Sequence, residues 1–299
     1  MFYSLKDRFR RMQFAGQCRG VLATKPVELD PSSPLAILGL LQHKDLLLYL
    51  LALKSFARQV RPGAVYVVND GSLNQEDAAI LHKHVPGLSV LDLERFRTAA
   101  CPRGGCWERL LAIAELVKDH YVIQLDSDTL TVGPIDEVRQ CVAGGTAFAL
   151  GTWDNQDFEP MTARCAHAQA LDSGADAHIQ LIAEANFDKL ADYHTLRYVR
   201  GCAGFAGFAQ GSFSKDFVEN ISQQMRAAIG DKWSAWGSEQ VMSNIVVANI
   251  AKSVVLPHPK YADCTKMKPN HTAFIHFIGS CRFSNGVYAE MGRRTIAAL

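Results

Sequence analysis

Short apolar runs alternate with helical segments through the first half of the chain, and this alternation constrains the fold more than any other feature. The runs lie at residues 35–41, 64–68, 88–93, 121–125 and 147–150. Unbroken apolar runs of this length are typical of strands that are buried on both faces. Because helical segments separate them, we expect an α/β fold in which helices flank a mostly parallel sheet.

The composition is that of a folded globular chain. With 299 residues, of which 48% are apolar and 20% charged, the chain has enough apolar side chains for a packed core. A net charge of +1 lacks the basic surplus expected of a protein that coats nucleic acid. The eight cysteines show no Cys-x-x-Cys spacing, so we expect no zinc ribbon and reduced thiols in a cytoplasmic protein.

A loop with three prolines divides the chain near its N-terminus. It lies between Pro26 and Pro34 and separates an N-terminal arm, residues 1–34, from the body. The body has a regular half, residues 35–150, and a less regular half, residues 151–299. We expect one or two helices in the polar segment that opens the second half.

The arm is basic and aromatic, with Arg8, Arg10 and Arg11 close to Phe9. Such a segment forms either an ordinary N-terminal helix or a peripheral contact with an anionic membrane surface. It lacks the unbroken apolar core of an export signal. In the apolar stretch 35–53, two charges in the middle favour a strand, a loop and a helix over a membrane span.

Two carboxylates follow the fourth apolar run. Asp126 and Asp128 are two residues apart, so they project to the same side of an extended chain. Ligands of open α/β sheets bind outside the carboxyl ends of the strands, where these two residues fall. Two like charges at a sheet edge need a counter-ion, which indicates a site for Mg²⁺ or Mn²⁺. The alternative is a solvated turn.

A second polar group follows the second apolar run. Asn69 and Asp70 precede a Gly-Ser pair and have side-chain oxygens that could accept hydrogen bonds from a base or ribose. The same residues also suit a plain strand-to-helix turn.

A third group follows the last apolar run, near residues 273–278. His276 could complete a metal site, Gly279 would let the backbone approach a ligand, and Arg282 could bind phosphate oxygens. A single histidine after a strand is more often a core residue. We consider His276 as a metal ligand only because the sequence also contains the carboxylate pair.

The fourth group is the segment Trp236-Gly237-Ser238-Glu239-Gln240. Ser238 could cap a helix and place Glu239 in its first turn, which would by itself explain an acidic residue there. The functional interpretation is that Glu239 and Gln240 face a substrate.

Together these residues resemble the GT-A-fold glycosyltransferases, which use nucleotide-sugar donors. Asp126-x-Asp128 resembles their Asp-x-Asp motif, and the Asn-Asp-Gly-Ser turn is similar to that of the inverting family-2 enzymes. His276-x-x-Gly279-x-x-Arg282 resembles the C-terminal His-x-x-Gly-x-x-Lys of the retaining family that includes glycogenin and bacterial lipooligosaccharide galactosyltransferases. The resemblance covers about residues 35–285.

The resemblance implies one catalytic domain with a GT-A-like, mostly parallel sheet. Residues 35–150 would form its nucleotide-sugar-binding half and residues 151–299 its acceptor-side half. The implied metal ligands for Mn²⁺ or Mg²⁺ are Asp126, Asp128 and His276. The implied donor-binding residues are Asn69, Asp70, Arg109, Asp126, Gly279 and Arg282, and the candidate catalytic residues are Glu239 and Gln240.

The sequence departs from the retaining pattern at three places. Arg282 replaces a lysine, Phe283-Ser284 replaces a frequent Pro-Trp, and Ser238-Glu239-Gln240 replaces a more usual Asp-Gln pair. Arginine also suits phosphate, so we keep its role. The mixture leaves a retaining or an inverting outcome open.

We therefore expect a metal-dependent transferase that moves a sugar from a nucleotide diphosphate sugar to an acceptor hydroxyl. Among such donors we expect a UDP-sugar. The acceptor would be a glycan, a lipid-linked glycan or a small molecule, and family analogy suggests cell-surface polysaccharide synthesis. One alternative is a sugar nucleotidyltransferase, although its Gly-rich signature is reduced here to Gly39. The other is a non-catalytic sugar-binding or scaffold protein.

Overall fold

The computed structural model describes residues 2–171, 174, 176–279 and 282–299. The helices are α1 Phe2–Cys18, α2 Leu46–Ala57, α3 Gln75–His84, α4 Trp107–Leu116, α5 Asp136–Gly144, α6 Met161–Ala170, α7 Ile179–Ala185, α8 Lys215–Ile229, α9 Ser238–Ala248 and α10 Val287–Ile296. The strands are β1 Leu35–Leu41, β2 Ala64–Asn69, β3 Ser89–Asp92, β4 Tyr121–Leu125, β5 Thr129–Thr131, β6 Ala147–Leu150, β7 Glu159–Pro160, β8 Arg197–Tyr198, β9 Cys202–Phe208, β10 Ser253–Val255, β11 Tyr261–Asp263 and β12 Phe274–His276. Over the described ranges, no helix has the length and apolar character needed to cross a bilayer.

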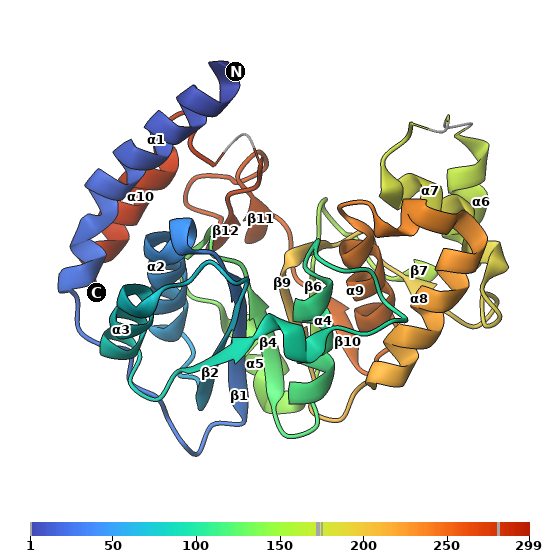
Figure 1. Ribbon diagram of the computed structural model, residues 1–299, viewed down its shortest axis with the longest axis horizontal. Coiled ribbons are helices and arrows are strands. Elements are labelled where there is room, and N and C mark those ends of the chain that lie inside the picture. Colours follow the sequence, from blue (N-terminus) through green and yellow to red (C-terminus); the bar gives the residue numbers. More distant parts are fainter. Residues whose placement is uncertain (1, 172–173, 175, 280–281) are drawn as a thin grey trace.

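A seven-stranded sheet forms the centre of the molecule, in the order β10-β6-β9-β4-β1-β2-β3 (Figure 1). Strands β1, β2, β3 and β4 pair in parallel, as do β6 and β10. Strand β9 runs antiparallel to both β4 and β6. The expected mostly parallel α/β architecture is therefore confirmed.

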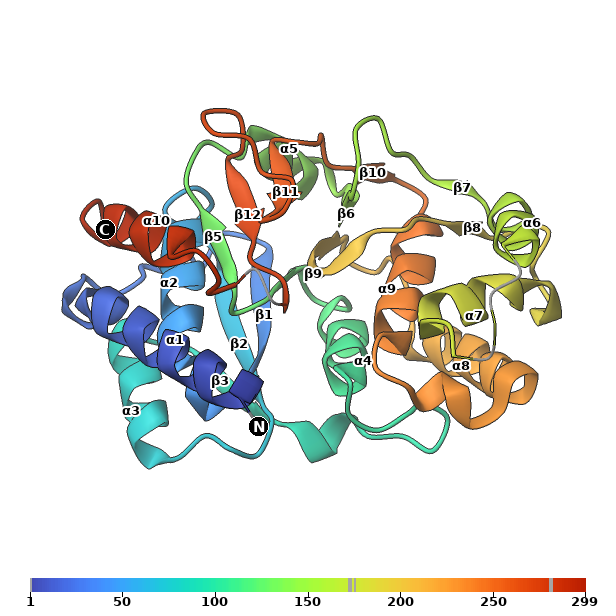
Figure 2. The same cartoon turned by 90° about the horizontal axis from the view of Figure 1, so that it is seen from above.

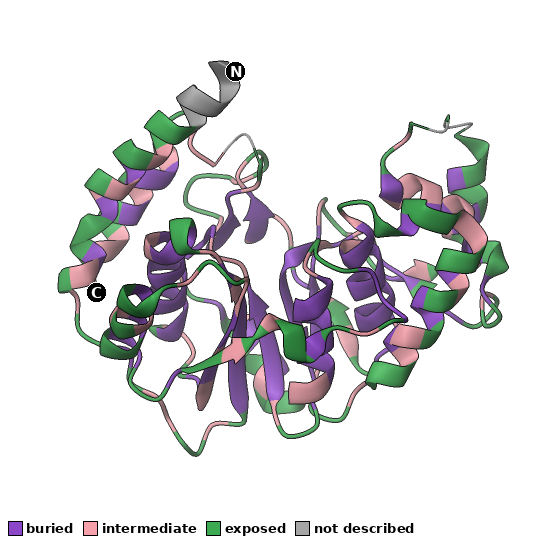
Figure 3. Ribbon diagram, viewed as in Figure 1, coloured by how far each residue is buried: buried purple, intermediate pink, exposed green. Residues whose placement is uncertain are grey.

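The central strands β1, β4, β6 and β9 are buried almost throughout, which explains why their residues are mostly apolar (Figure 3). Alternate residues of β1 point to opposite faces: Leu35 and Ile37 join one apolar core, and Ala36 and Leu38 join the other. Helices α1, α2, α3 and α10 contribute to the first core, and α4, α8 and α9 to the second. Figure 2 shows these two sets of helices on opposite sides of the molecule.

A small sheet brings the C-terminal part of the chain back to the centre. Its order is β11-β12-β5, and the antiparallel pairing of β12 with β5 places His276 opposite Thr129. Helix α10 then packs against α1, where the rings of Tyr288 and Phe14 lie 4.6 Å apart. Helix α10 was not expected from the sequence.

Several boundaries agree with the sequence analysis. The strands Leu35–Leu41, Tyr121–Leu125 and Ala147–Leu150 have the expected bounds, and the polar segment after β6 contains α6 and α7. The expectation that Ser238 caps α9 is wrong. Gly237 occupies the cap with a φ of 99°, a left-handed conformation that favours glycine, and the Ser238 hydroxyl accepts a hydrogen bond from the Trp107 indole.

The expectation of reduced thiols throughout is also wrong, because Cys264 is disulfide-bonded. The free cysteines among the described residues are Cys18, Cys101, Cys106, Cys141, Cys165 and Cys202. Sequence spacing does not show which loops approach one another, so it missed this bond. Cys281 lies outside the described residues.

Candidate active site

A cavity of about 790 Å³ opens where strands β1, β4 and β6 end. Its wall includes Gln42 after β1, Asp126 after β4 and Gly151 after β6, together with residues from β9, α9 and the small sheet. These strands run in the same direction, so their carboxyl ends meet at one edge. The cavity therefore lies where open α/β sheets bind ligands.

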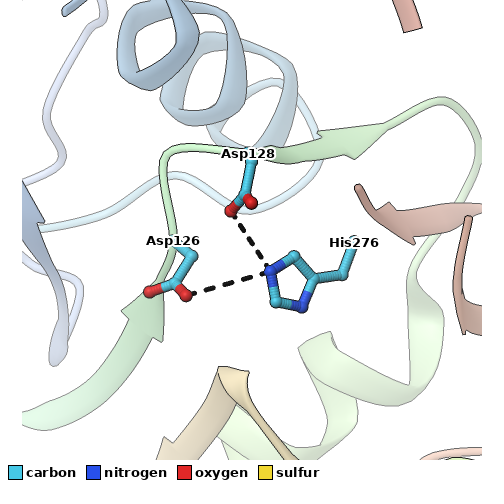
Figure 4. A group of neighbouring side chains, drawn as sticks. All are labelled: Asp126, Asp128 and His276. Carbon is cyan, nitrogen blue, oxygen red and sulfur yellow. Dashed lines mark hydrogen bonds and ion pairs between the residues drawn. The ribbon is translucent and has the colours of Figure 1, made fainter. Parts of the chain in front are cut away.

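Asp126, Asp128 and His276 meet in this cavity (Figure 4). The Nε2 atom of His276 lies 3.1 Å from Oδ1 of Asp128 and 3.8 Å from Oδ2 of Asp126. One potential ligand atom from each residue lies within 4.8 Å of the others. The Phe277 backbone N–H donates to the Asp128 carbonyl at 2.8 Å, which ties the two chain segments together. Two carboxylates and an imidazole at this spacing can hold one divalent cation.

Two arginines provide counter-charges for these carboxylates. Arg109 on α4 forms an ion pair with Asp126, and Arg282 forms one with Asp128. Burial opposes ionisation of Asp128, but His276 and Arg282 outweigh it and lower the pKa of this carboxyl. The carboxylate pair thus has protein counter-charges of its own, which the sequence argument for a metal counter-ion did not anticipate.

Glu239 and Gln240 lie in the first turn of α9 and line the cavity. Glu239 is 4% exposed, and its carboxylate lies 3.3 Å from Nη2 of Arg109. Burial raises the pKa of Glu239 to about 7, although Arg109 acts in the opposite direction. A raised pKa of this kind suits a group that exchanges a proton near neutral pH.

The C-terminal motif reaches the same cavity. Gly279 lines it with a φ of 45°, and Arg282 lines it with a quarter of its side chain exposed. The Arg282 Nε–H also donates to the Phe277 carbonyl at 3.2 Å, so the guanidinium is held beside the carboxylates. Ser280 lies outside the described residues.

Asn69 and Asp70 are placed differently. Asn69 Oδ1 accepts hydrogen bonds from the backbone N–H groups of Gly71 and Leu73, and Asp70 Oδ1 accepts from Ser72 N–H. Neither Asn69 nor Asp70, both of them described, lines the cavity. Their contacts are those of a strand-to-helix turn, and a role in nucleoside binding stays a prediction.

The sequence analysis missed two residues of β9 that contact His276. Cys202 Sγ lies 3.1 Å from His276 Nδ1. A Cβ at Gly204 would overlap the same ring, because the nearest atoms to its position all belong to His276. The only available signal was the Cys-Ala-Gly spacing at the start of an apolar strand, which puts both residues on one face.

Comparisons with known proteins give the class of fold. No protein-family model matches the chain, and no curated protein matches its sequence. A solved structure of the bifunctional glycosyltransferase WbbM is similar with a TM-score of 0.56 and 13% identity, over 92% of this chain and 51% of that one. The present chain therefore spans about half the length of that structure. This likeness confirms the GT-A-like fold that the sequence led us to expect.

Two further solved structures are less similar. The glycosyltransferase GlyE of Streptococcus pneumoniae TIGR4 has a TM-score of 0.46 and 12% identity, over 92% of this chain and 62% of that one. The galactosyltransferase LgtC, solved with donor and acceptor sugar analogues, has a TM-score of 0.43 and 13% identity, over 88% and 96%.

Proposed function

We propose that the chain is a metal-dependent glycosyltransferase that moves a sugar from a nucleotide diphosphate sugar to an acceptor hydroxyl. The observation that carries the proposal is the cluster of Asp126, Asp128 and His276 in the cavity at the carboxyl ends of the parallel strands. A fold shared with a solved glycosyltransferase supports it.

The donor set fits a divalent cation. Carboxylate oxygens and an imidazole suit Mn²⁺, and Mg²⁺ is the other candidate. Gly204 supports the assignment of His276 as a ligand. Because glycine has no Cβ, the His276 ring can occupy the space beside the strand. Such an ion, when bound by these three residues, supplies a Lewis acid for the charge of a departing diphosphate.

Arg282 and Arg109 are the proposed donor-binding cations. Arg282 lines the cavity beside Asp128, so its guanidinium can bind diphosphate oxygens. Arg109 is 4% exposed and spans Asp126 and Glu239, so it orients both carboxylates as well as facing the cavity. Gly279 completes the proposed phosphate-side wall.

Glu239 is the proposed proton-handling group. In an inverting reaction its carboxylate would take the proton of the acceptor hydroxyl, and a pKa near 7 suits that exchange. In a retaining reaction Glu239 or Gln240 would instead stabilise the positive charge that develops on the sugar. The anomeric configuration of the product distinguishes the two roles.

The acceptor is proposed to bind on the side formed by the less regular half. Trp153 and Trp236 line the cavity with 44% and 78% of their surfaces exposed, so their rings are available to stack on a sugar. This favours a glycan or a lipid-linked glycan as acceptor. Cell-surface polysaccharide synthesis is the corresponding pathway class.

Helix α1 is proposed to contact an anionic membrane on its cytoplasmic face. Phe9 and Met12 are 69% and 66% exposed, and Arg8 and Arg10 are exposed beside them. Exposed apolar and basic side chains on one helix suit the boundary between lipid headgroups and acyl chains.

Calorimetric titration of UDP with and without Mn²⁺ tests the proposed activity, followed by a screen of UDP-sugars for UDP release. Metal-enhanced UDP binding and release from one donor are the expected results. A preference for nucleoside triphosphates would instead indicate nucleotidyl transfer. No nucleotide binding at all would leave a non-catalytic protein and contradict the proposal.

A further inference from the structure

The two ring nitrogens of His276 have different partners. Nε2 faces the carboxylates of Asp126 and Asp128, and Nδ1 lies 3.1 Å from the sulfur of Cys202 (Figure 4 shows the first two contacts). The His276 side chain is 7% exposed, so water does not compete freely for either nitrogen. The thiol is therefore placed to determine how the imidazole is turned.

Strand β9 holds this ring from one side. Cys202 and Gly204 are two residues apart on the strand, so they face the same way. Gly204 leaves the space that the ring fills, and Cys202 provides a polar contact at its edge. The Gly204 carbonyl also accepts a hydrogen bond from the Asp126 backbone N–H at 2.9 Å. One short segment thus contacts two of the three proposed metal ligands.

We propose that Cys202 is a positioning residue for the metal site, which accepts a hydrogen bond from Nδ1–H of His276 and so keeps Nε2 turned toward the carboxylates. The inference rests on the proposed metal-dependent function. A histidine that ligates a metal through Nε2 has its proton on Nδ1, and the partner of that proton sets the tautomer and the ring orientation.

Cys202 is not itself part of the ligand set. The cluster of ligand atoms within 4.8 Å of one another contains Asp126, Asp128 and His276. The sulfur sits beside the nitrogen on the other edge of the ring, and one imidazole cannot direct both nitrogens at the same ion. When Nε2 ligates a cation, the ring proton is on Nδ1, and the sulfur 3.1 Å away is then the hydrogen-bond acceptor.

The experiment measures Mn²⁺ affinity directly, from the paramagnetic resonance signal of the free ion as Mn²⁺ is added to protein without nucleotide. Cys202→Ala and Cys202→Val remove the acceptor and should weaken Mn²⁺ binding by about 10–100-fold. Cys202→Ser keeps an acceptor and should bind Mn²⁺ close to wild type. Cys141→Ala is the matched control, because Cys141 is also a free cysteine but lies on α5.

Equal Mn²⁺ affinity of Cys202→Ala and the wild type would overturn the inference and leave the proposed function standing. No Mn²⁺ binding by the wild type would overturn both. Thermal melts check that each variant is folded. If the alanine and valine variants do not fold, the ¹⁵N shifts of His276 in the Mg²⁺-loaded wild type decide: a protonated Nδ1 supports the inference, and a protonated Nε2 overturns it.

Discussion

The Nη2 atom of Arg109 lies 3.3 Å from the Oε1 atom of Glu239, and each of the two side chains is 5% exposed. The same guanidinium forms an ion pair with Asp126. Arg109 therefore joins α4, the start of α9 and the end of β4 in one charged group. The protonation state of Glu239 decides how many negative charges this arginine faces.

The raised pKa of Glu239 predicts a pH-dependent stability. Burial raises this pKa from the ordinary 4.5 to about 7, so between these values the folded chain holds a proton that the unfolded chain has released. The contribution of Glu239 to the free energy of unfolding therefore falls as pH rises through this window, by on the order of 3 kcal/mol.

The glutamine of Glu239→Gln cannot titrate, so the variant should lack this fall in the free energy of unfolding with rising pH. Urea unfolding of the metal-free proteins at pH 5 and pH 8 gives the free energy of unfolding of variant and wild type. The difference between the two proteins should change between the two pH values. Glu28→Gln is the control, because the Glu28 side chain is 80% exposed. A stability difference that is the same at both pH values would contradict the pKa assignment.

Glu239→Gln should also lower turnover, by roughly 10²-fold or more if the carboxylate is a general base. The substitution keeps the size of the side chain, so UDP binding should change much less than kcat. Steady-state kinetics with the identified donor gives the number, and proton NMR of the product gives its anomeric configuration. A fully active variant would reduce Glu239 to a structural partner of Arg109.

Asp128→Asn should destabilise the metal-free protein. Asp128 is 4% exposed and contacts both Arg282 and His276, so the neutral amide removes the anionic partner of the guanidinium and of the imidazole. We expect a loss of about 1–3 kcal/mol. Thermal or urea unfolding in a chelator measures it, with Asp188→Asn at a more exposed ion pair as control. A more stable variant would show that repulsion between Asp126 and Asp128 dominates, as the sequence alone suggested.

If α1 contacts the membrane, substitutions of its exposed residues should affect vesicle binding and not catalytic activity. Replacing Phe9 and Met12 with serine should lower co-sedimentation with anionic vesicles and leave UDP-sugar hydrolysis unchanged, because both side chains are exposed. Deleting the helix is a poorer test, since Phe14 is 3% exposed and packs on Tyr288. Equal sedimentation of the variant and the wild type would contradict the contact.

The sequence predicted the strands of the sheet well because burial on both faces leaves unbroken apolar runs, as in Leu35–Leu41. It also indicated Asp126 and Asp128, since their spacing and the strand before them are local features. The counter-charges from Arg109 and Arg282 and the contact of Cys202 with His276 depend on tertiary packing. No sequence pattern indicates that Cys202 and His276, which are 74 residues apart, are in contact.

Cap chemistry shows the same limit at shorter range. The Asn74 and Asp77 capping box of α3 joins two residues only three positions apart, so it is a pattern that the sequence itself displays, and it is present in full. Ser238 also has the residue type of a cap. Its hydroxyl instead accepts a hydrogen bond from Trp107, which is more than a hundred residues away in sequence.

Calorimetric titration of UDP at saturating Mn²⁺ into the wild type and Asp128→Asn tests the central claim most directly. Asp128 touches His276 and Arg282, the two residues of the C-terminal motif that are proposed to act on metal and diphosphate. The account predicts that the wild type binds UDP in a Mn²⁺-dependent way and that the variant loses UDP affinity and Mn²⁺ dependence together. Wild-type UDP affinity with unchanged Mn²⁺ dependence in the variant would contradict it and place the metal site elsewhere.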